Sequence, residues 1–70
     1  MGWEAKYSNF GVVKIEGKNV KVFSDKTDYI TIELGEEEAV NAYWAGDYLK
    51  IRLKNGKVRR YSNSNYYITI

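Results

Sequence analysis

Hydrophobic and polar residues alternate with a period of two along most of this chain of 70 residues. This period matches the side-chain repeat of a β-strand that has one buried face and one exposed face. Polar turns at residues 16–19 and 24–28 separate the first runs, so the pattern predicts consecutive antiparallel hairpins. The side chains expected to point inward in this half are Val13, Ile15, Val20, Val22, Ile30, Ile32 and Leu34.

The clearest predicted element is a hairpin over residues 48–62. In its first strand the apolar residues Leu49, Ile51 and Leu53 alternate with basic ones. The dipeptide Asn55-Gly56 follows, and it is the strongest short signal for a two-residue type I′ turn, in which both residues have positive φ. A two-residue loop determines the register, and here it places Arg52 opposite Arg59.

Residues 36–44 are compatible with two structures. Three acids in a row, Glu36 to Glu38, suit the N-terminal end of a short helix, because they complement the helix dipole. The alternative is a strand with Val40, Ala42 and Trp44 on one face. The strand is favoured, because so short a helix is marginal without strong packing.

The last apolar run, residues 66–70, predicts a terminal strand with Tyr66, Ile68 and Ile70 on one buried face. Such a strand needs a pairing partner, either the first strand of a closed barrel or an edge strand of another subunit. We therefore expect a single all-β domain over residues 1–70. Its predicted architecture is an antiparallel β-meander of about five to seven strands, forming a closed or partly open barrel of SH3-like size.

The composition excludes several classes of chemistry. The chain contains no cysteine and no histidine, which removes disulfides, thiolate metal sites, a cysteine nucleophile and the commonest general base. The glutamate run lacks the spacing of a calcium loop, and the glycines are spread singly as turn residues. We expect a non-enzymatic protein without cofactor or metal. The lack of cysteine favours a cytoplasmic location, and no apolar run is long enough for a membrane span.

Charge is distributed unevenly, and it points to a candidate binding surface. Residues 1–44 hold five lysines and eight acids, a net charge of −3, whereas residues 45–70 hold six basic residues and one acid, a net charge of +5. The predicted register places seven residues on one face of the 48–62 hairpin: Tyr48, Lys50, Arg52, Lys54, Lys57, Arg59 and Tyr61. Like charges opposite each other destabilise a sheet, so two opposed cationic pairs beside a tyrosine favour contact with nucleic acid. The same register puts Arg60 on the apolar face.

Three other interpretations remain open. The basic face would also suit an acidic protein surface. The terminal strand and the exposed aromatic residues would suit a protein–protein adaptor or a homo-oligomer, and the small size fits an accessory protein of a phage or mobile element. In the third, the hairpin binds no ligand: its lysines guard a solvated edge against aggregation, and residues 36–38 fold over it.

Overall fold

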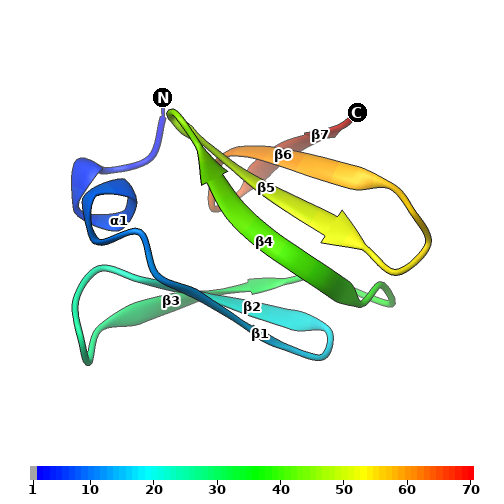
Figure 1. The fold of residues 1–70 in the computed structure, drawn as a ribbon, viewed down its shortest axis with the longest axis horizontal. Helices are drawn as coiled ribbons and strands as arrows, with labels where there is room; N and C mark the ends of the chain where they lie inside the picture. Colours follow the sequence, from blue (N-terminus) through cyan, green and yellow to red (C-terminus); the bar gives the residue numbers. More distant parts are fainter. Residues whose placement is uncertain (1) are drawn as a thin grey trace.

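The computed structural model describes residues 2–70, and these form one short helix followed by seven strands (Figure 1). The elements are α1 (Ala5–Phe10), β1 (Val13–Glu16), β2 (Asn19–Phe23), β3 (Tyr29–Glu33), β4 (Ala39–Ala45), β5 (Tyr48–Leu53), β6 (Val58–Asn63) and β7 (Tyr66–Thr69). The prediction of a mostly β antiparallel meander is confirmed. The strand favoured for residues 36–44 is confirmed, because β4 occupies most of that segment in place of the alternative helix. The helix α1 was not foreseen.

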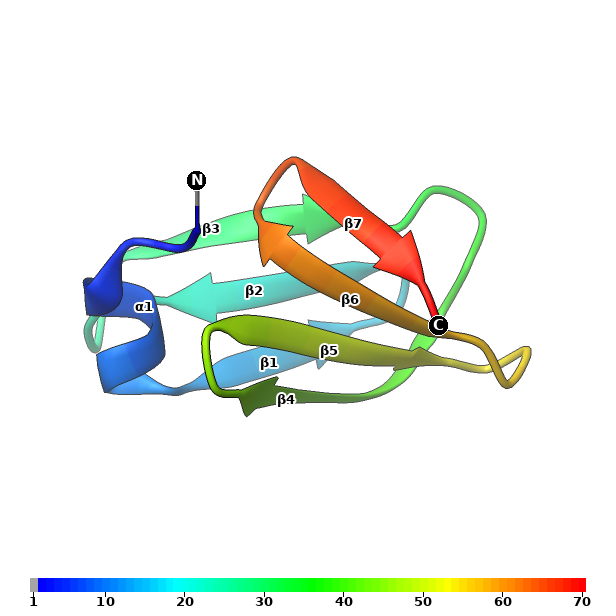
Figure 2. The same ribbon diagram turned by 90° about the horizontal axis from the view of Figure 1, so that it is seen from above.

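The strands form two sheets in which every hydrogen-bonded neighbour is also a neighbour in sequence. The N-terminal sheet has the order β1-β2-β3, and the C-terminal sheet has the order β4-β5-β6-β7. Figures 1 and 2 show the two sheets stacked, with α1 at one end and β3 and β7 as outer strands. Within residues 2–70 no ladder joins β3 to β7, so the strands do not close into a barrel.

The core lies between the two sheets and is entirely apolar apart from one tyrosine hydroxyl. Its buried residues are Val20, Val22, Ile32 and Leu34 from the N-terminal side and Leu49, Ile51, Leu53 and Tyr61 from the C-terminal sheet. Each set follows the period of two along its strands, as expected of the inner faces of stacked sheets. Ile15, also expected inside, is 37% exposed.

Two tryptophans cover one end of this core. The indole rings of Trp3 and Trp44 meet edge to face with centroids 5.2 Å apart. The Nε1 of Trp3 donates a hydrogen bond to the carbonyl oxygen of Tyr61 at 3.0 Å, which ties the N-terminal segment to β6. The buried Nε1 of Trp44 has no hydrogen-bond acceptor among the described residues. Phe23 lies on the outer face of the N-terminal sheet against Tyr29, with ring centroids 5.0 Å apart.

A register shift near the start of β4 explains why one of its predicted inward residues is exposed. Ala39 pairs with Leu53, but Asn41 pairs with Arg52, so Val40 is an extra residue between them. Val40 is 54% exposed, whereas Trp44 packs against the core as predicted. This bulge turns one apolar side chain outward without changing the strand beyond it.

The β5–β6 hairpin has a three-residue loop in place of the predicted two-residue loop. The N–H of Gly56 donates to the carbonyl of Leu53 at 3.0 Å, and the N–H of Leu53 donates to the carbonyl of Lys57 at 2.8 Å. Gly56 has φ 93°, but within residues 2–70 no residue other than glycine has positive φ, so the expectation of a left-handed Asn55 is wrong. These contacts define a turn of type I closed by a glycine bulge.

Replacing Gly56 with valine should destabilise the protein by about 1 kcal/mol or more, because a β-branched side chain resists positive φ. Lys57→Val is the matched control, since Lys57 is exposed and adjacent but has no positive φ. Urea denaturation followed by circular dichroism measures both. Equal midpoints for the two variants would contradict the assignment of this turn.

The terminal strand β7 pairs with β6 as an outer strand, but it is not buried. Tyr66, Ile68 and Ile70 are 59%, 37% and 56% exposed. The prediction that Ile68 and Ile70 are buried is therefore wrong. These residues do share one face, but it is the face that points away from the core.

Candidate functional site

The observed β5–β6 register differs by one residue from the predicted one, and it changes which β6 side chains join the basic face. Leu49 pairs with Tyr61, and Lys50 pairs with Arg60. Because Leu49 points into the core, Tyr61 does so as well, and it is only 2% exposed. Burial raises the pKa of the Tyr61 hydroxyl above its usual range. The prediction that Tyr61 is part of the basic face is therefore wrong.

Arg59 also lies on the inner side of β6. Its guanidinium carbon is 4.5 Å from the centroid of the Tyr67 ring, and its Nη1 donates to the Tyr61 hydroxyl at 3.3 Å. The guanidinium of Arg59 thus stacks on the Tyr67 ring of β7, and Arg59 does not face outward with Arg52. The predicted Arg52–Arg59 pair is wrong, and Arg52 lies opposite Val58.

Acidic residues fold over the tip of the hairpin, as the third interpretation expected. The Nζ of Lys54 is 3.8 Å from Glu38 Oε2, and the Nδ2 of Asn55 donates to Glu37 Oε2 at 2.8 Å. The backbone N–H of Lys54 also donates to the carbonyl of Glu38 at 2.8 Å. Lys54 and Lys57 are exposed at this tip, and the carboxylate of Glu38 offsets part of the charge of Lys54.

The remaining predicted residues form a different basic surface, on the face of the C-terminal sheet that points away from the core. Tyr48, Lys50 and Arg52 of β5 alternate with the buried Leu49 and Ile51. Pairing brings Tyr43 and Arg60 to either side of Lys50, in one row across β4, β5 and β6. We call this surface the cationic face, and its members are Tyr43, Tyr48, Lys50, Arg52 and Arg60.

Arg60 was missed because the two-residue turn gave the wrong register for β6. Tyr43 was missed because residues 36–44 were left open between a helix and a strand, and its pairing with Lys50 belongs to the β4–β5 ladder. Treating Lys54-Asn55-Gly56 as a three-residue loop with a glycine bulge would have placed Arg60 opposite Lys50 from the sequence alone. In the structure the Arg60 guanidinium carbon is 4.6 Å from the centroid of the Tyr48 ring. Arg60 therefore lies over an aromatic ring on the outer surface rather than inside the core.

The cationic face differs electrostatically from the opposite side of the molecule. The N-terminal sheet also has two facing cations, Lys14 and Lys21, but the Nζ of Lys21 lies 3.1 Å from Glu16 Oε2. That contact raises the pKa of Lys21, mainly through the side-chain hydrogen bond. Among residues 2–70, no ion pair involves Lys50, Arg52 or Arg60. No ion pair among the described residues therefore offsets the repulsion between Lys50 and Arg60.

A shallow hollow of ≈ 620 Å³ lies at the Tyr48 end of the cationic face. Its lining residues are Gly2, Asp47, Tyr48, Ser62, Asn63 and Tyr66. Tyr48 and Tyr66 are 40% and 59% exposed, so two aromatic rings border an open, partly polar depression. Its openness suits a flat group that stacks on a ring more than an enclosed small-molecule ligand.

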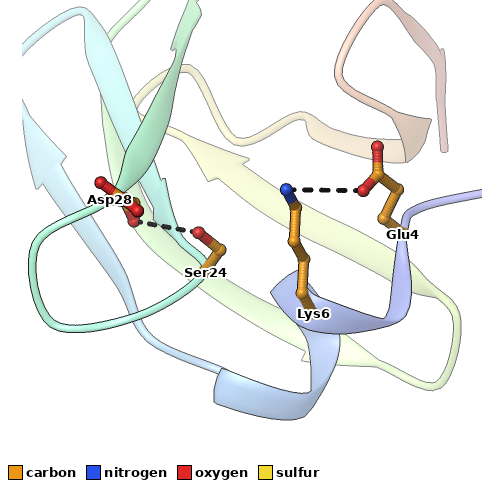
Figure 3. A network of polar contacts seen from close by, with 4 residues as sticks. All are labelled: Glu4, Lys6, Ser24 and Asp28. Atoms are coloured by element: carbon orange, nitrogen blue, oxygen red, sulfur yellow. Dashed lines mark hydrogen bonds and ion pairs between the residues drawn. The ribbon is translucent and has the colours of Figure 1, made fainter.

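The other polar clusters have local structural roles. Asp25 Oδ1 accepts the N–H groups of Thr27 at 2.8 Å and Asp28 at 2.7 Å, and these bonds hold the pKa of Asp25 below its usual range. These bonds stabilise the polar turn that was predicted at residues 24–28. Figure 3 shows Ser24 Oγ donating to the carbonyl of Asp28 at 3.3 Å, and the exposed pair of Lys6 Nζ and Glu4 Oε2 at 3.6 Å. The described residues contain no group of three or more potential metal ligands.

Residues 2–70 include no helix with the length and apolar character needed to cross a bilayer. Comparison of the chain with protein-family models, with curated proteins and with solved structures found no match. Arguments about its function therefore depend on the surface itself.

Proposed function

We propose that the cationic face binds single-stranded nucleic acid. The observation that carries the proposal is the direct opposition of Lys50 and Arg60 on an exposed sheet face with no acid paired to either within residues 2–70. Such a pair destabilises the free protein, and a phosphate placed between the two side chains would turn that repulsion into attraction. Arg52, two residues along β5, extends the track for a second phosphate.

The aromatic residues supply the sequence-tolerant part of the interaction. Tyr43 and Tyr48 are 39% and 40% exposed on the same face as the cations. Exposed rings on a sheet are platforms for unpaired bases, and interleaved cations follow the backbone. Arg60 over the Tyr48 ring keeps its charge, so the pair offers a stacking surface and a phosphate contact together. A single strand can use both, whereas the bases of a duplex are already stacked.

Titration of a fluorescent single-stranded oligonucleotide of about 15 nucleotides tests this function by anisotropy. Two phosphate contacts predict that the logarithm of the affinity falls with the logarithm of salt concentration with a slope of about −1.4. Arg52→Glu with Arg60→Glu should abolish binding while the circular dichroism spectrum is retained. Tyr48→Ala should weaken binding by about 1–3 kcal/mol through the loss of stacking.

Lys14→Glu with Lys18→Glu is the matched control, because it makes the same change in net charge away from the cationic face. Both lysines are exposed, and neither takes part in an ion pair of the described residues. This variant should retain most of its affinity. An equal loss in both double variants would show attraction to net charge only. No binding by the unaltered chain at low salt would contradict the proposal and direct attention to an acidic protein partner.

A further inference from the structure

The outer edge of β7 is open to a further strand. In residues 2–70, β7 pairs only with β6, and no ladder covers its other side. Figure 2 shows β7 at the margin of the C-terminal sheet, beyond β6. Natural sheet edges are usually guarded by charges, proline or bulges, and residues 66–70, Tyr-Tyr-Ile-Thr-Ile, contain no charge and no proline.

Hydrogen bonding shows which residues of this edge can accept a new strand. The N–H of Ile70 donates to the carbonyl of Val58 at 2.9 Å, so Ile70 points its backbone groups toward β6. Ile68 does the same, because it pairs with Arg60 two positions further along β6. Alternation then directs the backbone groups of Tyr67 and Thr69 away from β6, at the open edge.

We propose that a second copy of this chain pairs with this edge, β7 against β7, as an antiparallel two-fold dimer. A two-fold axis at Ile68 places Tyr67 opposite the partner's Thr69, and these are the two residues whose backbone groups point outward. Each Tyr67–Thr69 pair can exchange two backbone hydrogen bonds, as a hydrogen-bonded antiparallel pair does. The two C-terminal sheets would then continue as one sheet across the axis.

The side chains fit the same register. On the outer face, Ile68 meets the partner's Ile68 and Tyr66 meets the partner's Ile70. On the inner face, Tyr67 meets the partner's Thr69. Aromatic residues opposite β-branched ones are favourable cross-strand pairs, and no charge is brought into contact at any position. The open edge of β7 is therefore complementary to the same edge of a second copy, both in its backbone hydrogen-bonding groups and in its side chains.

The edge of β3 also has no second ladder partner, but it lacks this self-complementarity. The N–H of Leu34 donates to the carbonyl of Lys18, and the N–H of Ser24 donates to the carbonyl of Asp28. Leu34 and Asp28 therefore point their backbone groups toward the β2 side, and alternation leaves those of Tyr29, Thr31 and Glu33 pointing outward. A two-fold pairing centred on Thr31 would bring the Glu33 of each copy to the interface, with Asp28 just beyond Tyr29. These acids guard β3 in the way that charged residues guard natural edges. The two remaining edge strands, β1 and β4, lie beside each other, which leaves β7 as the self-pairing strand.

Light scattering after size exclusion tests the dimer by mass, since the single chain is 8.1 kDa. The unaltered chain should run at twice that mass at high concentration and dissociate on dilution. Thr69→Pro removes an N–H from the open edge but none from the β6 ladder, so it should raise the dissociation constant about tenfold or more. Thr31→Pro makes the same change at the β3 edge and should leave the dimer intact.

Ile68→Lys is a second variant, because it places two like charges face to face at the two-fold axis. It should give a monomer whose circular dichroism and melting match a folded protein, with Val40→Lys on β4 as its dimeric control. A monomeric unaltered chain at the highest concentrations would overturn the proposal. So would a dimer that persists unchanged in both Thr69→Pro and Ile68→Lys. Neither result would decide the proposed nucleic-acid binding, because the oligonucleotide titration measures the cationic face and not the β7 edge.

Discussion

Replacing Ile51 with alanine should remove about half of the free energy of unfolding of this protein. Ile51 is fully buried at the centre of β5, between the two sheets. Loss of its side chain should cost about 2–5 kcal/mol, since the neighbours collapse only partly into the cavity. A domain of this length has a total free energy of unfolding of only about 4–10 kcal/mol. Urea denaturation followed by tryptophan fluorescence measures the loss.

Val40→Ala is the matched control for Ile51→Ala. Val40 is also β-branched and lies on the neighbouring strand, but its position in the β4 bulge leaves it 54% exposed. Its truncation should change the free energy of unfolding by no more than about 0.5 kcal/mol. Equal effects of the two substitutions would contradict the placement of the core.

Replacing Tyr61 with alanine should destabilise the fold by about 3–5 kcal/mol, an effect on stability rather than directly on binding. The Tyr61 ring is buried against Tyr67, with centroids 4.9 Å apart, and its hydroxyl accepts a hydrogen bond from Arg59. Its carbonyl also accepts the hydrogen bond from the Trp3 indole. Thermal melts by circular dichroism measure the change.

Two further variants separate the parts of this effect. Tyr61→Phe retains the ring and loses only the hydroxyl contact, so it should cost about 0.5–1.5 kcal/mol. Tyr66→Ala removes an exposed tyrosine at the start of β7 and should leave the melting temperature of the monomer nearly unchanged. If Tyr61→Ala melts like the unaltered chain but loses affinity for the oligonucleotide, then Tyr61 belongs to the binding surface after all.

The sequence predicted the strands well because burial on one face of a sheet requires apolar residues at every second position. Val20, Val22, Leu49 and Ile51 alternate with polar residues, and all four are fully buried. The register of the β5–β6 hairpin could not be predicted as reliably as the strands themselves. Asn55-Gly56 suits both a two-residue loop and a three-residue loop with a bulge at glycine, and the two differ by one residue. A shift of one residue moves every β6 side chain to the other face.

This uncertainty affected the predicted positions of the candidate-site residues differently on each strand. Tyr48, Lys50 and Arg52 were placed correctly together, because they lie on β5 and their alternation does not depend on the turn. Arg59 and Arg60 exchanged faces because β6 has basic residues in succession and no apolar alternation to identify its inner side. The exposure of Ile68 and Ile70 was unpredictable for another reason. An apolar strand face looks the same in sequence whether the core or a second chain covers it.

The sequential order of both sheets has a consequence for how the chain folds. Each of the five ladders joins strands that follow one another along the chain, across a turn of a few residues. Closing such short loops costs little chain entropy, so each hairpin can form without waiting for distant segments to meet. Folding rates across small proteins rise as contacts become more local in sequence. The protein should therefore fold faster than β-sandwiches of similar size whose sheets are built from long crossover connections, with docking of β1 beside β4 as its main non-local step.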